Sequence, residues 1–169
     1  MEVDVAIRTR RTHKVFHREP VDQETLEELF ELARWAPNHH LTNPWRFRVL
    51  GPEALTRLKG AAGPEAAPKL DRAPTLVVVS ALLSGDTQSD EEDLLATGCA
   101  AYAVLLGAHA RGLAGYWRTP AVLRTIEGRE ALGIAEDEHV VGLLYLGRPR
   151  QEQRIPERAP LEHVVSWLD

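Results

Sequence analysis

The sequence of 169 residues has one cysteine, Cys99, one methionine, and only 6% aromatic residues. A single cysteine excludes an internal disulfide and any zinc site built from several thiolates. Cations are also outnumbered, because 20 Lys and Arg stand against 25 Asp and Glu, for a net charge of -5. This balance argues against broad binding to nucleic acid or to an anionic membrane surface.

Long hydrophobic runs are absent too. The longest stretch without a formal charge, Leu94–Ala110, contains Thr97, Tyr102 and His109 and is short for a membrane span. The first four residues carry two acids where a signal peptide would need bases. With 44% hydrophobic and 27% charged residues, the composition is typical of a folded globular protein. We therefore expect one domain, residues 1–169, located in the cytoplasm and without nucleic-acid or membrane partners.

Periodicity in the sequence predicts several helices and strands. Apolar residues at helical spacing after Asp22 predict a helix that ends before Pro37, and alternation over Trp45–Val49 predicts a half-exposed strand. The apolar run Thr75–Leu82 predicts a strand that is covered on both faces. Further helices are expected over 52–59, from a Ser89–Glu92 capping box to about residue 111, and from 119–120, with further strands over 113–117 and 139–146. This alternation alone favours an α/β sheet protein.

The acidic chain nevertheless begins with a cluster of bases. Five cations lie between Ile7 and Arg18, and six acids without a cation follow between Glu19 and Ala33. Guanidinium groups bind phosphate through paired hydrogen bonds, and the Thr12 hydroxyl would add a neutral donor. The cluster fits either an anion-binding site or a solvated surface that pairs with the acidic segment.

Two further segments have the composition of binding loops. Prolines bracket a polar loop from Ala36 to Trp45 that contains His39 and His40. Neighbouring residues of an extended loop point in opposite directions, and no carboxylate stands at ligand spacing, so a metal site is disfavoured. The glycine-rich segment 112–120 would let the backbone approach a flat ligand, or would simply connect a helix to a strand.

Familiar catalytic motifs are missing from the sequence. It has no G-x-G-x-x-G after a strand, no P-loop and no G-x-S-x-G elbow. Cys99 lies inside an apolar helical segment, where we expect a packed thiol and not a nucleophile. If the protein is an enzyme, a bound cofactor is expected to supply the chemistry.

Taken together and in order, these segments resemble the nitroreductase family of FMN-dependent oxidoreductases, over about residues 7–167. The matching segments are Arg10-Arg11-Thr12-His13-Lys14, Ala36-Pro37-Asn38-His39 through Asn43-Pro44-Trp45, residues 112–119, residues 141–149 and residues 158–165. The resemblance implies an α+β fold, a three-layer sandwich whose mixed, mainly antiparallel sheet is packed by helices. It also implies an intertwined homodimer with FMN at two interface sites, in which the helix over 94–111 packs on its own copy.

The resemblance also assigns residues to the cofactor. It places Arg10, Arg11 and Thr12 at the FMN phosphate and ribityl chain, and Lys14 at the flavin N1–C2 edge, where a cation stabilises the reduced form. It further implies cofactor contacts by six other residues: Trp35, His39, Trp117, Arg118, Thr119 and, at the phosphate, Arg158. Trp35 and His39 are expected to reach the flavin of the other subunit. No metal and no catalytic side chain are expected.

The implied activity is ping-pong hydride transfer from NAD(P)H, through flavin N5, to an electron-poor acceptor such as a nitroaromatic or a quinone. The alternative is a flavin-binding or storage protein with little turnover, since both need the same FMN contacts. Leu41 stands where many members have small polar residues, and the chain lacks an active-site insertion. These differences leave the substrate open.

Overall fold

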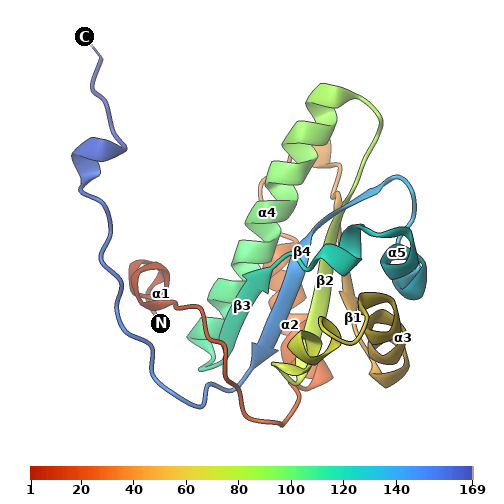
Figure 1. The fold of residues 1–169 in the computed structure, drawn as a ribbon. Coiled ribbons are helices and arrows are strands. Elements are labelled where there is room, and N and C mark those ends of the chain that lie inside the picture. The colour runs from red at the N-terminus through yellow and green to blue at the C-terminus, as the bar shows by residue number, and fades with distance from the viewer. Residues whose placement is uncertain (169) are drawn as a thin grey trace.

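The computed structural model describes residues 1–168, and its centre is a four-stranded sheet in the order β1-β2-β4-β3 (Figure 1). Every neighbouring pair is antiparallel, and one register shift interrupts the β2–β4 pairing between Val79 and Ser80. The strands are β1 (Trp45–Val49), β2 (Thr75–Leu82), β3 (Ala114–Arg118) and β4 (Glu138–Gly147). Among residues 1–168, the one parallel pairing is an isolated bridge between Thr12 and Gly115.

Helices surround this sheet. The α-helices are α1 (Val3–Thr9), α2 (Gln23–Ala33), α3 (Pro52–Ala62), α4 (Thr87–Ala110) and α5 (Ile126–Leu132). Short 3-10 segments are η1 (His39–Leu41), η2 (Ala67–Asp71), η3 (Ala121–Arg124) and η4 (Leu161–His163). The longest helix, α4, crosses the sheet and also packs on α2.

The core has two halves because alternate strand residues point to opposite faces of the sheet. Val77 and Val79 of β2 pack with α2 and α4, whereas Leu76 and Val78 pack with α3, η2 and η3. Burying one such side chain completely contributes about 1.5–3 kcal/mol. Helices therefore cover both faces, and the expected α+β architecture is confirmed.

The prediction of an α/β sheet from alternation alone is wrong, because the pattern of helices and strands carries no information about strand direction. Three local boundaries also differ. The helix from Pro52 continues to Ala62, past the expected stop. Helix α4 is capped by Asp86, which accepts from the Ser89 backbone N–H, and not by a Ser89–Glu92 box. Residues 121–124 form a 3-10 turn, and α5 begins only after its Thr125 cap.

The two ends of the chain lie outside the sheet and the helices that cover it. Helix α1 and the segment after β4 lie together beside the C-terminal end of α4, and the last residues project away as an arm (Figure 1). Almost every residue from 150 to 168 is exposed. By length and composition α4 could cross a membrane, but half of its most apolar window is buried inside the protein, as in a core helix.

Candidate functional site

The basic residues of the two chain ends meet in one cavity of about 290 Å³. The N-terminal cluster contributes Arg10, Arg11 and Thr12, and the arm contributes Arg158 together with Gln153, Arg154 and Pro156. No carboxylate lines this cavity among the described residues. Four of the residues assigned to the cofactor by resemblance are thus brought together from positions almost 150 apart in the chain.

The two arginines keep unused hydrogen-bond donors. The Nε atoms of Arg10 and Arg11 are buried and have no partner within residues 1–168. The Arg10 guanidinium lies 5.8 Å from the centre of the Tyr102 ring on α4, while an Arg11 NH1 group donates to the carbonyl of Arg8 at 2.6 Å. Buried donors without acceptors are costly, so this cavity is suited to an anion with several acceptor oxygens.

Two histidines lie behind the arginines. The Nε2 atom of His109 is 2.8 Å from the Thr9 hydroxyl, which ties the end of α4 to α1. Burial lowers the pKa of His13, and the neighbouring His109 and Arg10 lower it further. Burial also lowers the pKa of His109, helped by Arg10 and Arg11. Both rings are therefore harder to protonate than a free imidazole, and the arginines carry the positive charge of the site.

Strand β3 begins at this cluster, and its side chains point alternately to the two faces of the sheet. Its start, Gly115, forms the bridge to Thr12. Trp117 points to the α4 side, where its Nε1 donates to the Val141 carbonyl at 3.3 Å and its ring covers Gly142. Arg118 points to the opposite side and lines a cavity with η2 and η3. Consecutive strand residues must diverge in this way, so one chain does not bring both side chains to one surface.

The polar loop before β1 is anchored to the N-terminal end of α4. The Nδ1 atom of His39 lies 2.6 Å from a Glu92 carboxylate oxygen, and the Thr42 hydroxyl donates to the buried Asp93 at 2.6 Å. The hydrogen bond from His39 lowers the pKa of Glu92. The His39 and His40 rings stack at 3.8 Å.

The expectation that these rings point in opposite directions is wrong, because the loop is not extended. His40 and Leu41 both have φ of 53°, in the left-handed region that is strained for side chains other than glycine. Leu41 and Trp35 project into solvent, each with 77% of its surface exposed. The Trp35 Nε1 group donates to Glu31 at 3.3 Å.

The loop and the basic cluster lie at opposite ends of α4. Glu92 contacts the loop and His109 contacts α1. Their separation of 17 positions along α4 corresponds to about 26 Å of helix. Trp35 and His39 therefore do not join the cluster within one chain. Lys14 and Thr119 are exposed near the cluster and at the end of β3, respectively.

Cys99 is exposed on α4, so the expectation of a packed thiol is wrong. Within residues 1–168, no group of three His, Cys, Asp or Glu side chains could hold a metal ion. The partners Tyr102, His109, Glu92 and Arg154 were not identified from the sequence, because nothing in their spacing links them to the basic motif.

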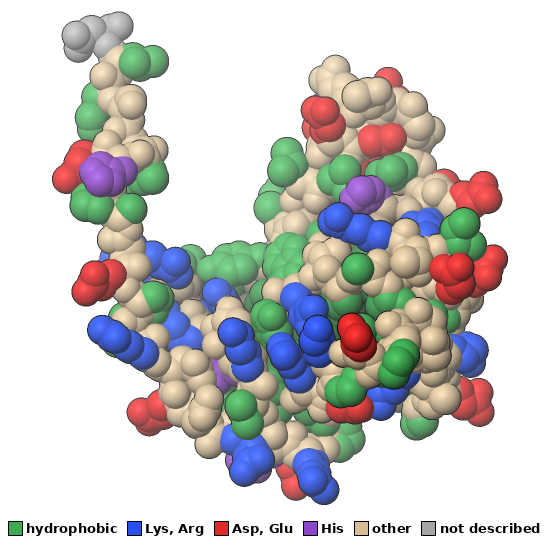
Figure 2. All heavy atoms as spheres, in the orientation of Figure 1, with side chains coloured by type: hydrophobic (Ala, Val, Ile, Leu, Met, Phe, Trp, Pro, Cys, Tyr) green, Lys and Arg blue, Asp and Glu red, His purple; other side chains and the backbone are tan. Residues whose placement is uncertain are grey.

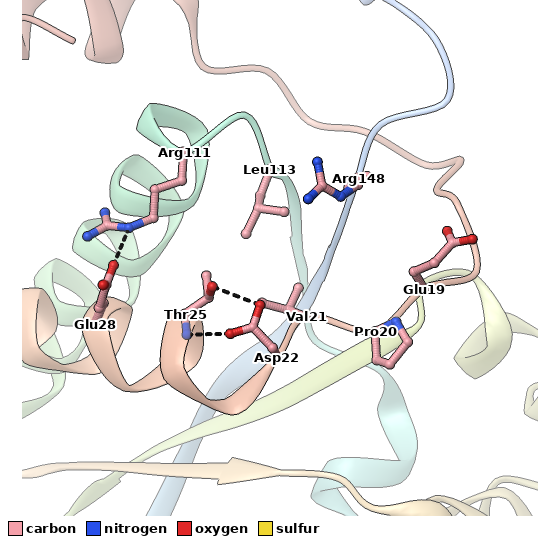
Figure 3. Close-up of a pocket in the computed structure, with 9 residues that line it drawn as sticks. All are labelled: Glu19, Pro20, Val21, Asp22, Thr25, Glu28, Arg111, Leu113 and Arg148. Atoms are coloured by element: carbon pink, nitrogen blue, oxygen red, sulfur yellow. Dashed lines mark hydrogen bonds and ion pairs between the residues drawn. The ribbon is translucent and has the colours of Figure 1, made fainter.

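A second cavity, of about 250 Å³, lies between the start of α2 and the end of α4 (Figure 3). Arg111 is paired with Glu28 at 2.8 Å, and Asp22 caps α2 through Thr25. Because acids and bases here are already paired or mixed, this cavity has no clear charge preference. The basic cavity is the stronger candidate site.

The fold and site define an α+β protein with an arginine-lined cavity at the edge of its sheet. A family model described as the nitroreductase family matches residues 7–68 and 61–148. The Escherichia coli K12 protein named "Putative NAD(P)H nitroreductase YdjA" is 31% identical over 75% of this chain and 77% of its own. The chain therefore belongs to the nitroreductase family, and the enzyme class expected from the motifs is confirmed at this level.

Other relatives agree. The Bacillus subtilis protein named "Putative NAD(P)H nitroreductase YfhC" is 25% identical over 92% of this chain and 88% of its own. A nitroreductase-like protein from Bacillus cereus has the same fold, with a TM-score of 0.91, 23% identity and coverage of 100% and 97% of the two chains. The FMN and NADPH-dependent nitroreductase NfnB from Sphigopyxis sp. strain HMH superposes with a TM-score of 0.84 at 18% identity, with both chains fully covered.

Proposed function

We propose that this protein is a cytoplasmic, single-domain, FMN-dependent oxidoreductase that transfers electrons from NAD(P)H to nitroaromatics or quinones. The observation that carries the proposal is the cavity in which Arg10, Arg11 and Arg158 converge. Among residues 1–168 no carboxylate lines it, and two buried guanidinium nitrogens lack acceptors. A phosphate monoester supplies the acceptor oxygens that these donors need. Membership of a family with NAD(P)H nitroreductases supports the same assignment.

The residues present fit FMN along its length. Arg10, Arg11, Thr12 and Arg158 would hold the phosphate beside Gly115, where β3 begins. Arg118 lies three residues further along β3, roughly 10 Å away at the usual rise of a strand. A five-carbon ribityl chain spans such a distance, so the flavin ring would lie near the end of β3, beside Thr119.

When bound, FMN supplies reversible two-electron chemistry at its ring. The protein's part is to bind, to orient and to set the local charge. Lys14 is exposed two residues after Thr12, and the family resemblance would place its cation at the N1–C2 edge, which favours the reduced cofactor. Lys14→Met should therefore slow flavin reduction by NAD(P)H more than it weakens FMN retention, which stopped-flow spectroscopy and FMN titration measure separately.

The overall reaction balances without a catalytic side chain. One hydride from NAD(P)H and one proton convert a nitro group to a nitroso group and water, or a quinone to a hydroquinone. In a ping-pong cycle, NAD(P)+ leaves before the acceptor binds in the same place. Parallel lines in double-reciprocal plots are the expected kinetic pattern.

A homodimer would complete each site. Exposed apolar side chains follow the free side of α4, including Leu95, which is 74% exposed, and Tyr102. Figure 2 shows a hollow between the arm and the body with hydrophobic side chains along its floor. Two α4 helices packed antiparallel about a two-fold axis would place the His39 loop of one copy at the basic cluster of the other.

The decisive experiment is purification followed by FMN titration and steady-state assays with NADH, NADPH, menadione and nitrobenzene. The proposal expects a yellow dimer that oxidises at least one nucleotide with at least one acceptor. A yellow protein that oxidises neither nucleotide is instead the flavin-storage protein. A protein that fails to bind added FMN refutes both functions.

A further inference from the structure

The cavity that Arg118 lines is separate from the phosphate cavity and has its own charge. It measures about 310 Å³ and lies between α3, η2 and η3 on the opposite side of the sheet from α4. Its two ionisable lining groups are Lys69 and Arg118, and no carboxylate lines it among the described residues. The rest of the lining is mainly small and apolar, including Ala62, Ala66 and Val122.

Among residues 1–168, neither Lys69 nor Arg118 has an anionic partner. Within residues 1–168, the salt bridges join other groups, and the neighbouring Asp71 is paired with Lys59. Figure 2 shows Lys and Arg side chains gathered in the middle of the visible face, over the part of the sheet formed by β3 and β4. An anion that enters the cavity would meet positive charge without competition from an acid.

A buried polar group also lies near Arg118, although it does not line the cavity itself. Tyr145 of β4 is completely buried, and its hydroxyl has no hydrogen-bond partner in the described part of the chain. Its ring contacts Tyr116 of β3, with 5.4 Å between the ring centres. Burial raises the pKa of the Tyr145 hydroxyl, against the opposing effect of Arg118 and Arg72. A neutral phenol therefore remains close to the Arg118 guanidinium.

We propose that this cavity is a carboxylate-recognising subsite for the electron acceptor, so that the preferred acceptors are small aromatic acids. The inference rests on the proposed function, in which the flavin ring lies at the end of β3 next to Arg118 and Pro120. The small apolar lining accepts a flat ring, and Lys69 and Arg118 pair with its carboxylate. The acceptor's nitro group would then face the flavin from outside the cavity.

The test compares an anionic with a neutral acceptor in the FMN-loaded protein. The ratio of kcat/KM for 4-nitrobenzoate to that for nitrobenzene is expected to fall about tenfold or more in Lys69→Met and in Arg118→Met, because each loses a charge-assisted contact. Lys69→Arg should restore much of the ratio. Arg124→Met removes a cation from η3 that does not line the cavity and should leave the ratio as in the wild type.

A binding measurement without turnover accompanies the kinetics. Titration of benzoate into the oxidised holoprotein should perturb the flavin absorbance, with a dissociation constant that rises about tenfold in Lys69→Met. An unchanged acceptor ratio in active Lys69→Met overturns the inference. Weakened FMN binding with an unchanged ratio also overturns it, because the cations would then hold the cofactor. By contrast, failure of the wild-type protein to reduce any acceptor refutes the proposed function itself.

Discussion

Arg48 of β1 and Glu138 of β4 form a paired ion contact across the intervening strand β2. The two Arg48 terminal nitrogens lie 2.7 and 2.6 Å from the two Glu138 carboxylate oxygens. Ser80 of β2, which is completely buried, donates to the same carboxylate at 2.5 Å. The contact therefore joins three strands beside the register shift at Ser80.

We predict that Glu138→Gln destabilises the protein by about 2–4 kcal/mol, since a half-buried guanidinium loses its partner. Burial alone would raise the pKa of Glu138, but hydrogen bonds from Arg48 and Ser80 outweigh it and hold the pKa below its ordinary value. A carboxyl whose folded pKa is lowered stabilises the fold above its unfolded pKa, and this contribution is lost as the pH falls through the folded value.

Urea unfolding at pH 7 and at pH 3.5 measures both effects. The difference in unfolding free energy between wild type and Glu138→Gln should shrink at the lower pH. Glu136→Gln, on the exposed turn before β4, is the matched control. An equal loss of stability in the two variants would contradict the role of the Arg48 pair.

A second prediction concerns Gly142, which lies directly under the Trp117 indole. A Cβ at Gly142 would overlap the indole nitrogen and its ring neighbours. Gly142→Ala should lower the free energy of unfolding by about 1–3 kcal/mol, the usual range for overpacking. It should also alter the near-ultraviolet circular dichroism spectrum. Gly60→Ala is the control, because a Cβ there meets nothing within 4 Å and Gly60 lies inside α3. The free energy of unfolding of Gly60→Ala should rise by up to about 1 kcal/mol. Equal shifts in melting temperature for the two variants would refute the packing argument.

The phosphate assignment predicts the effect of Arg10→Met on cofactor affinity. Loss of a charged donor should raise the FMN dissociation constant about tenfold to a hundredfold, measured by quenching of flavin fluorescence. Riboflavin, which lacks the phosphate, should bind wild type and variant with equal affinity. A similar loss of affinity for riboflavin would show that Arg10 does not contact the phosphate.

The proposed dimer predicts that Leu95→Glu yields a monomer with weakened FMN binding. A charge placed on the exposed apolar side of α4 would have to be desolvated at the helix pair. Ile126→Glu is the control, because Ile126 is similarly exposed (71% against 74%) but begins α5 on the other side of the sheet. Light scattering after size-exclusion chromatography gives the mass, and a dimeric Leu95→Glu protein would contradict this interface.

Several elements followed directly from local sequence. The start of α2 after Asp22, the apolar spacing of α2 and the buried run of β2 occur where the pattern predicts them. Such features depend on contacts between residues that are close in the chain, so the local sequence is enough to predict them. The predicted Ser89–Glu92 capping box of α4 is wrong, because Asp86 and Ser89 both stand three residues before a position that a helix cap could contact. Only the path of the preceding chain selects Asp86.

The sequence by itself determined that an acidic chain carries a local basic motif, and its ordered motifs determined the family. Tertiary structure decided which cations lie together. It brought Arg158 to Arg10 and Arg11, and turned Arg118 away from Trp117 into the separate cavity beside η2 and η3. It also placed the His39 loop at the far end of α4. The physical reason is that periodicity records how each segment divides its polar and apolar faces. Contacts between distant segments depend on strand order and chain direction, which the pairing of the whole sheet sets.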